Sequence, residues 1–180
     1  MSARDQNTVY IDYIWLVSLS ILFGLSFTLT SIAVRDIPPI SLAAGRLLIA
    51  FLMLYPLMRL NAQKMPDIGP IWIALLASGL FGNALPFALI SWGQVNVQAG
   101  LTAIFMAVMP LATILLAHVF TDEEKLDRWK FIGVMFGLVG VIVLMGWSAL
   151  NAIGDDLIRQ TAILLAAICY AINAIVTRKL

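Results

Sequence analysis

The chain has 180 residues, of which 62% are apolar and 12% are charged, and its formal net charge is +1. Soluble domains are about half apolar and about a quarter charged, so this composition excludes a soluble protein and indicates a polytopic membrane protein. The single cysteine, Cys169, excludes a disulfide within the chain. The small net charge says nothing about partners, and we expect no nucleic-acid partner.

Six apolar stretches are long enough to cross a bilayer, which takes about 20 helical residues for a hydrocarbon layer of about 30 Å. The stretches show no apolar–polar alternation, which excludes the strands of a membrane barrel. Short connections between them predict antiparallel neighbours. We therefore predict an all-α polytopic membrane helical bundle with six transmembrane helices, at roughly 13–34, 39–60, 69–92, 98–120, 130–148 and 160–177.

The polar N-terminus precedes an apolar run that is too long for the core of a cleaved signal peptide, so we expect a retained first helix. Lys and Arg residues concentrate in cytoplasmic segments of membrane proteins. With the N-terminus inside, the outer segments hold only Arg35 and Arg159. We predict an integral protein of the cytoplasmic (plasma) membrane with a cytoplasmic N-terminus, because its inner segments would hold Arg4, Arg59, Lys64, Lys125, Arg128, Lys130, Arg178 and Lys179.

An internal repeat relates the first and sixth stretches. Residues Phe27–Ile37 (FTLTSIAVRDI) align with Tyr170–Leu180 (YAINAIVTRKL), so that Phe27 pairs with Tyr170. Five spans separate the two copies, and an odd number places the second copy in the opposite orientation. Inverted repeats of this kind are typical of transporters, because two related halves can expose a midplane site alternately to each side.

The acidic residues lie in tails, loops or helix ends, so a proton relay through a mid-span carboxylate finds no residue here. The single histidine, His118, has no Cys or carboxylate at ligand spacing on its own helix face. The sequence holds no zinc motif, no Ser-His-Asp candidate set and no phosphate loop. We expect no catalytic residue, no metal, no cofactor and no enzymatic activity.

Arg46 is the only basic residue well inside a predicted span. An arginine at the bilayer centre costs about 3 kcal/mol on insertion scales, and less where it can snorkel. One interpretation is that Arg46 snorkels to the outer headgroups or caps the carbonyls of a neighbouring helix. The other is that it faces a wet cavity and pairs with a substrate carboxylate or phosphate. Without a buried acid, its partner must be a carbonyl, water, lipid or ligand.

Further polar and aromatic residues lie at a depth suited to a cavity. Asn83 lies beside Gly and Pro residues that loosen its helix, and interhelical hydrogen bonding is its alternative role. Trp92 lies at a span end, which also fits an interfacial aromatic belt. With Arg46, the candidate substrate-binding residues are Asn83, Trp92, Tyr170 and Asn173, in a cavity lined by spans one to four and six.

Pro110 lies inside the fourth stretch, where it removes a helical donor and predicts a kink or local opening. The kink is either architectural or a gating hinge, and Pro110 is our candidate hinge. The fifth stretch carries Gly133 and Gly137 in a GxxxG pattern, which allows close helix packing. Packing within the chain and contact in a homodimer are the two interpretations.

The sequence resembles the EamA-type transporters of the drug/metabolite transporter superfamily. The resemblance covers nearly the whole chain and rests on FGLSF in the first stretch, IPPISLAAGRLLIAF, LPFALISWGQVNVQAGLTAIFMAVMPLATILLAHVF and DEEKLDRWKFIGVMFGLVGVIVL, in this order. It implies ten helices in two inverted five-helix repeats around a central cavity. It also places Arg46, Pro110 and Glu124 on family motif positions, with Lys125 where the family usually has Arg.

The resemblance implies a cytoplasmic tail (1–12), a first EamA repeat of five helices (13–148) and the start of a second, inverted repeat with one helix (149–180). Because four helices of the second repeat are missing, we favour a fragment of a ten-helix protein, and assembly with another chain or a homodimer is the alternative. The expected function is export of small metabolites, such as amino acids or drug-like solutes, by alternating access. A non-transporting membrane scaffold or subunit is the alternative function.

Overall fold

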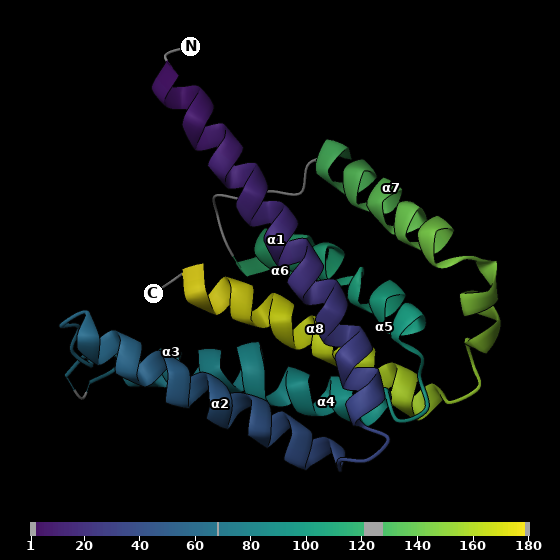
Figure 1. Ribbon diagram of the computed structural model, residues 1–180. Helices are drawn as coiled ribbons and strands as arrows, with labels where there is room; N and C mark the ends of the chain where they lie inside the picture. The colour runs from purple at the N-terminus through teal and green to yellow at the C-terminus, as the bar shows by residue number, and fades with distance from the viewer. Residues whose placement is uncertain (1–2, 68, 121–127, 179–180) are drawn as a thin grey trace.

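The computed structural model describes residues 3–67, 69–120 and 128–178 (Figure 1). Within these ranges the chain is helical and contains no strand, which confirms the all-α prediction. The elements are α1 (Ala3–Ala33), α2 (Pro39–Leu60), α3 (Ile71–Gly79), the π-helical turn η1 (Leu80–Ala84), α4 (Leu85–Gly93), α5 (Ala99–Met106), α6 (Met109–Phe120), α7 (Arg128–Met145), the 3₁₀ helix η2 (Trp147–Ala152) and α8 (Leu157–Arg178).

Six stretches of these helices are long and apolar enough to cross a membrane, which confirms the predicted number of spans. They are Tyr10–Ala33, Pro39–Leu60, Ile71–Gly93, Ala99–Phe120, Arg128–Met145 and Leu157–Arg178. The third and fourth spans are each built from more than one helix.

The third span is interrupted by the π-helical turn η1, directly before Pro86. Pro86 has no N–H for an α-helical bond, and its ring would collide with the preceding turn of a regular helix. The N–H of Leu85 reaches back five residues to the carbonyl of Leu80, as in a π-helix. The wider turn therefore accommodates Pro86 inside a continuous span.

The fourth span is interrupted between α5 and α6, at Ala107 and Val108. The N–H of Val108 bonds the carbonyl of Phe105, three residues back, at 3.2 Å, instead of the carbonyl four residues back. Pro110 follows as the second residue of α6. At that position its missing N–H costs no intrahelical bond, so the new helix begins where the proline is tolerated.

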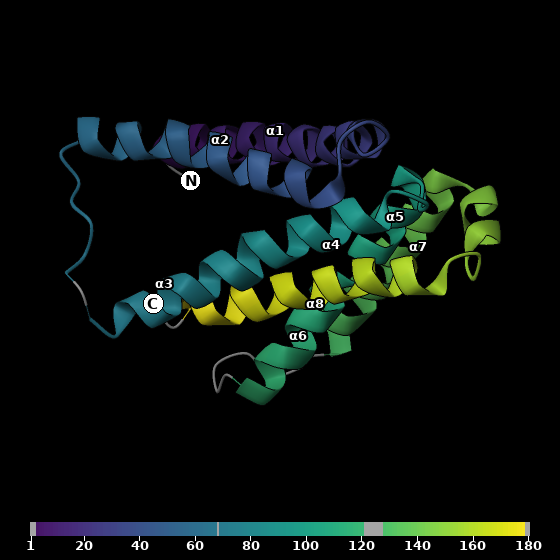
Figure 2. The same cartoon turned by 90° about the horizontal axis from the view of Figure 1, so that it is seen from below.

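Helix α8 lies at the centre of the bundle and contacts α3, η1, α4, α5 and α6. Figure 2 shows α1 and α2 together on one side of α4 and α8, with α6 on the other side. Small side chains allow helices to approach closely in lipid, where no hydrophobic force drives them together. The buried residues of α8 are mostly of this kind: Gln160, Ala162, Ile163, Ala166, Ala167, Ala171 and Ile175.

Three connections lie at the same end of the bundle in Figure 2: 34–38 between α1 and α2, 94–98 between α4 and α5, and 146–156 between α7 and α8. We call this the Asp156 end. A compact apolar cluster lies near it, where Val97, Leu101 and Ile104 pack against Ile163 of α8. The structure is therefore densely packed at this end.

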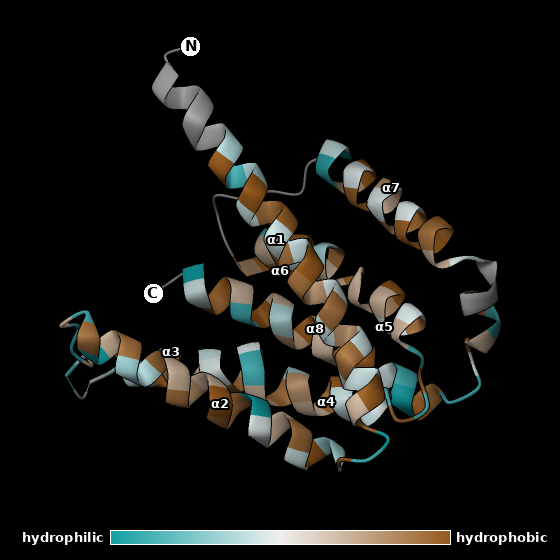
Figure 3. Ribbon diagram, viewed as in Figure 1, coloured by the Kyte–Doolittle hydropathy of each residue, from teal (hydrophilic) through white to brown (hydrophobic). Residues whose placement is uncertain are grey.

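The peripheral helices α1, α2 and α7 expose apolar side chains along most of their length, and Figure 3 shows that hydrophobic residues recur along these three helices. Such surfaces suit contact with lipid tails. Gly133 and Gly137 of α7 have no atom outside their own helix within 4 Å of where a Cβ would stand. The interpretation that this GxxxG pattern packs within the chain is therefore wrong for the described residues, because α7 lies at the edge of the bundle and turns other residues toward α5 and α6.

Candidate functional site

Arg46 joins the two outer helices α1 and α2. Its Nη2 donates a hydrogen bond to Oγ of Ser26 at 2.9 Å, and its Nη1 donates to Oγ1 of Thr30 at 3.2 Å. The Thr30 hydroxyl donates its own proton to the carbonyl of Ser26, at 2.7 Å, which leaves its lone pairs free to accept from the arginine. Ser26 and Thr30 lie four residues apart on α1, and each thus presents one hydroxyl acceptor to the Arg46 guanidinium.

A third contact places the guanidinium over an aromatic face. The Cζ atom of Arg46 lies 4.2 Å from the centre of the Phe87 ring on α4. A cation over an aromatic face gains about 0.5–2 kcal/mol, and a hydrogen bond to a charged group about 1.5–3 kcal/mol net. Together these contacts offset an insertion cost of about 3 kcal/mol without a carboxylate partner. Arg46 is directed toward α1 and α4, where its charge is held inside the bundle.

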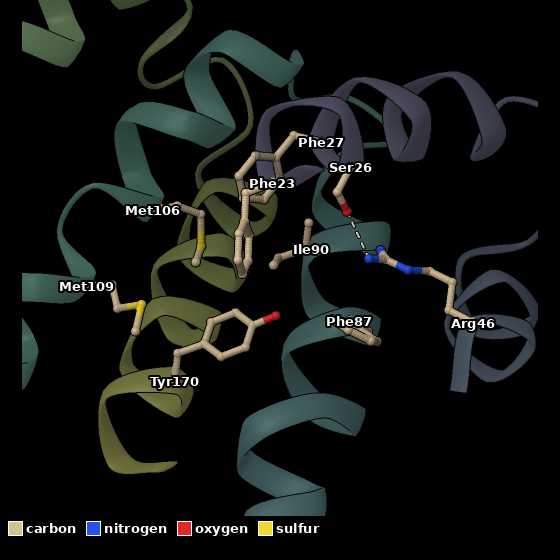
Figure 4. Close-up of a pocket in the computed structure, with 9 residues that line it drawn as sticks. All are labelled: Phe23, Ser26, Phe27, Arg46, Phe87, Ile90, Met106, Met109 and Tyr170. Atoms are coloured by element: carbon tan, nitrogen blue, oxygen red, sulfur yellow. Dashed lines mark hydrogen bonds between the residues drawn. The ribbon is translucent and has the colours of Figure 1, made fainter. Parts of the chain in front are cut away.

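These contacts form one wall of a cavity of about 250 Å³ (Figure 4). Every span except the fifth, which is α7, contributes lining residues. These five spans are the ones predicted from the sequence to surround a cavity. The lining residues are Phe23, Ser26, Phe27, Arg46, Phe87, Ile90, Met106, Met109 and Tyr170. Arg46 and Ser26 also border a more open hollow between α1 and α2, whose other walls are Thr30 and aliphatic side chains.

Tyr170 enters the cavity from the central helix α8. Its ring stands opposite α4, and its hydroxyl points into the cavity toward the side that carries Phe87 (Figure 4). The structure therefore brings together two of the five predicted binding residues, Arg46 and Tyr170, although they lie on different helices and far apart in the sequence.

Asn173 lies against the π-helical turn, outside the residues that line the cavity. A Cβ added to Gly82 would stand 2.5 Å from Nδ2 of Asn173, so only a glycine admits the amide at this distance. Oδ1 of Asn173 is buried and has no hydrogen-bond partner within the described part of the chain. The neighbouring Asn83 is exposed and does not line the cavity. Asn83 is thus a residue of η1 itself, and Asn173 packs against η1 at Gly82.

Trp92 lies at the Asp156 end and also does not line the cavity. Nη1 of Arg159 donates to the carbonyl of Trp92 at 2.6 Å, and the guanidinium lies 4.8 Å from the indole centre. Nε of Arg159 lies 3.2 Å from Oδ2 of Asp156, which also accepts from Nδ2 of Asn96 at 2.7 Å. These contacts fasten the α4–α5 connection to the start of α8, and we call them the Arg159 latch.

The carboxylate of Asp156 is the acceptor in this latch. The hydrogen bond from Asn96 and then the backbone N–H of Arg159, with the nearby Arg159 charge, hold the pKa of Asp156 below its usual value. Each of these favours the ionised form. The latch is therefore formed with Asp156 negatively charged.

A further polar contact joins the α4–α5 connection to α1. Nε2 of Gln94 donates to the carbonyl of Phe27 at 3.1 Å. Oε1 of Gln94 and Oγ of Ser91 are buried and have no hydrogen-bond partner among the described residues. Buried polar groups are usually paired, so these two oxygens are sites where water would be favourable.

Sequence reasoning missed most of the cavity wall. Ser26 and Thr30 are ordinary polar residues of a first span, and Phe23, Phe87 and Met106 resemble any lipid-facing residue. The available signal was the spacing of Ser26 and Thr30, which places both hydroxyls on one face of a helix. Glu124 and Lys125, which the family pattern singles out, lie outside the described residues. Within those residues, no cluster of His, Cys, Asp and Glu could hold a metal ion.

Comparison with known protein families identifies one match. The model of the EamA-like transporter family matches residues 11–146. No solved structure matches the chain.

Three curated relatives show the extent of the similarity. The chain is similar to the uncharacterized transporter YoaV of Bacillus subtilis, with 22% identity over 87% of the chain and 53% of the relative. It is 29% identical to the uncharacterized inner membrane transporter YedA of Escherichia coli K12, over 72% of the chain and 42% of the relative. It is 28% identical to the uncharacterized transporter YyaM of Bacillus subtilis, over 93% of the chain and 55% of the relative. The chain thus spans about half the length of the relatives it matches.

Proposed function

The chain belongs to the EamA-like transporter family, and from this premise we propose that it forms part of an alternating-access exporter of small metabolites, such as amino acids or drug-like solutes. The observation that carries this proposal is the cavity of about 250 Å³ with Arg46 in its wall, formed by all spans but α7. A mid-bundle cavity with few polar groups among apolar side chains is typical of a small-molecule site.

Transport belongs to the assembled protein. The curated relatives are about twice as long as the region they share with this chain. We propose that a second repeat, of which α8 is the first helix, completes the cavity, either within a longer chain or from a second copy. The Lys and Arg distribution favours a cytoplasmic N-terminus, which would place the Arg159 latch at the outer face.

The arrangement of Phe27 and Tyr170 supports the inverted repeat. The two residues correspond in the repeat alignment, and both line the same cavity, one from α1 and one from α8. In an inverted pair of repeats, corresponding residues face a shared midplane site from opposite halves. Chance similarity between apolar helices would place them on unrelated faces.

Rocking of one half against the other needs helices that bend. Helical bonding is interrupted before Pro110, at Ala107 and Val108, and widened at η1 before Pro86. Both interruptions adjoin cavity residues: Met106 and Met109 flank the first, and Phe87 follows the second. We propose Pro110 as a hinge for this motion. Pro110→Ala supplies an N–H that allows α5 and α6 to join into one continuous helix, so it should slow transport and leave substrate binding intact.

The test of transport uses inside-out vesicles that contain the assembled protein. Arg46→Ala should reduce uptake of an accepted solute at least tenfold, because the charge that holds it is lost, while insertion remains normal. Arg59→Ala is the matched control, because Arg59 lies on the same helix but is exposed and does not line this cavity. Normal uptake by Arg46→Ala, with disturbed topology, would instead assign Arg46 a purely structural role.

One observation favours the alternative function, a non-transporting scaffold or subunit. The exposed Gly133 and Gly137 on α7 leave a face open to a close helix partner. A scaffold would form a stable complex through α7 and move no solute from a metabolite panel. Flux measured in the same vesicles therefore decides between the two functions.

A further inference from the structure

The cavity holds one formal charge, and that charge is positive. Its nine lining residues include Arg46 and no carboxylate, and their other polar groups are the hydroxyls of Ser26 and Tyr170. The ion pair between Arg159 and Asp156 lies at the far end of α4, outside the residues that line the cavity. The electrostatic field inside the cavity therefore favours an anion.

The guanidinium of Arg46 has donors left for a ligand. It carries five N–H groups, and two of them are used by Ser26 and Thr30. The planar fork of an arginine matches a carboxylate, which can accept two parallel hydrogen bonds. The contacts with α1 and the Phe87 ring hold the fork in place before a ligand arrives.

The remaining wall is apolar and partly aromatic. It consists of Phe23, Phe27, Phe87, Ile90, Met106 and Met109. A ligand rich in hydroxyls, such as a sugar, would lose its hydrogen bonds with water and find few replacements. An apolar body beneath the charged group matches this wall.

An aromatic wall can also bind a cation, so a cationic ligand is the alternative to an anionic one. The face of Phe87 is already occupied by the guanidinium, whose centre lies 4.2 Å from the ring. A second cation in the cavity would be repelled by Arg46 and would find no lining carboxylate to compensate. The aromatic groups therefore contact the ligand body, and a cationic ligand is disfavoured.

The volume limits the size of the ligand. An engineered apolar cavity of about 150 Å³ accommodates benzene. The cavity here, at about 250 Å³, leaves room for one ring with a short arm and a carboxylate. A two-ring compound would require the cavity to enlarge.

We propose that the cavity binds a small organic monocarboxylate with one ring or a branched aliphatic body, held by Arg46 through its carboxylate. This inference rests on the proposed transport function and narrows its substrate class. Among the solutes named above, it selects anionic drug-like compounds over amino acids, because no lining carboxylate receives an α-ammonium group.

The test compares four probes that share a phenylpropyl body. These are 3-phenylpropionate, 3-phenylpropan-1-ol, 3-phenylpropylamine and phenylalanine, and their dissociation constants are measured by ligand-observed NMR with the purified chain in nanodiscs at pH 7. The carboxylate should bind at least tenfold more tightly than the alcohol and than phenylalanine, and the amine should bind most weakly. Equal or tighter binding of the amine, or no binding of the carboxylate, would overturn the proposal.

Variants tie the preference to one side chain. Arg46→Gln should reduce the affinity for the carboxylate to that for the alcohol, and Arg46→Lys should retain part of the preference. Arg59→Gln should change nothing, because Arg59 is exposed outside the cavity. If Arg46→Gln does not fold, Arg46→Lys still tests the proposal, because lysine keeps the positive charge. A complete loss of the preference for the carboxylate in Arg46→Lys would contradict a site that binds its ligand through this charge.

Flux separates this inference from the transport function. Arg46-dependent binding in the stated order without flux in proteoliposomes of the assembled protein would support the ligand class and contradict transport. Flux of the amine in preference to the carboxylate would support transport and overturn the ligand class.

Discussion

Helices α7 and α8 each contain an 18-residue window with the same mean hydropathy, 1.8, yet they occupy opposite environments. None of the residues in the α7 window is buried among the described residues, whereas 39% of those in the α8 window are. The difference lies in the size and placement of residues. Helix α8 turns a face of alanines toward its neighbours, whereas a Cβ added to Gly133 or Gly137 of α7 would lie within 4 Å of no other described helix. In a membrane, where lipid is as apolar as leucine, close packing and not hydropathy determines which helix is central.

The comparison also bears on the proposed repeats. In that proposal α8 begins the second unit, yet it packs against α3, α4, α5 and α6, which belong to the first. Helix α8 also supplies part of the cavity wall, through Tyr170. The first five spans therefore do not close a core by themselves.

The largest effect is expected from truncating the buried face of α8. Ile163 is fully buried and belongs to the apolar cluster. Ile163→Ala should lower the free energy of unfolding by about 2–4 kcal/mol, because it leaves a cavity in the packed centre. Val139→Ala on α7, where the side chain is exposed, should change it by less than about 0.5 kcal/mol. Unfolding in mixed micelles measures both, and equal losses would remove the distinction between the helices.

A methyl group added at a helix contact should have the next largest effect. A Cβ on Gly93 would stand 2.5 Å from Cγ1 of Ile163 and 3.1 Å from the carbonyl of Arg159. Gly93→Ala should push α4 away from α8 and cost about 1–3 kcal/mol in the same assay. Gly137→Ala on α7 meets no atom and should be tolerated. A destabilised Gly137→Ala would indicate that α7 has a close partner in the membrane.

Loss of the Arg159 latch should cost less. Arg159→Gln removes the bond to the Trp92 carbonyl and the ion pair with Asp156, and should reduce the free energy of unfolding by about 1 kcal/mol, because the side chain is partly exposed. Among the described residues, Arg128→Gln on α7 loses a contact with Trp129 of its own helix, at 5.5 Å, and it should have no measurable effect. An equal loss in the free energy of unfolding for Arg159→Gln and Arg128→Gln would contradict a stabilising role of the latch.

The smallest effect is a pH dependence of the latch. Because the folded-state pKa of Asp156 lies below its usual value, its stabilisation is complete above the unfolded pKa of about 3.9 and is lost as the pH falls through the folded value. Unfolding midpoints followed from pH 6 to pH 3 should therefore decline less steeply in Asp156→Asn than in the wild type. Asn96→Ala removes the largest cause of the lowered pKa and should also make the decline smaller, because the folded and unfolded pKa values of Asp156 then lie closer together. Unchanged profiles in both variants would show that the latch does not titrate.

The site was only partly predictable. Arg46 stood out because a charge inside a span is costly, and Tyr170 because it is polar at suitable depth. Asn83 and Trp92 also have polar groups at suitable depth, yet Asn83 is exposed within η1 and Trp92 contacts Arg159 at the Asp156 end. Depth along a helix follows from position in the sequence, but the direction that a side chain faces depends on how neighbouring helices pack.

The sequence alone determined the class, the six spans and the interruption at Pro110, because hydropathy, helix length and a missing N–H act locally along the chain. Tertiary structure decided that α8 is central, that Ser26 and Thr30 hold Arg46, and that the GxxxG face of α7 has no partner in the described chain. These features depend on contacts between helices with similar apolar composition. Shape and the orientation of small residues distinguish such helices, and both become visible only when the helices are packed together.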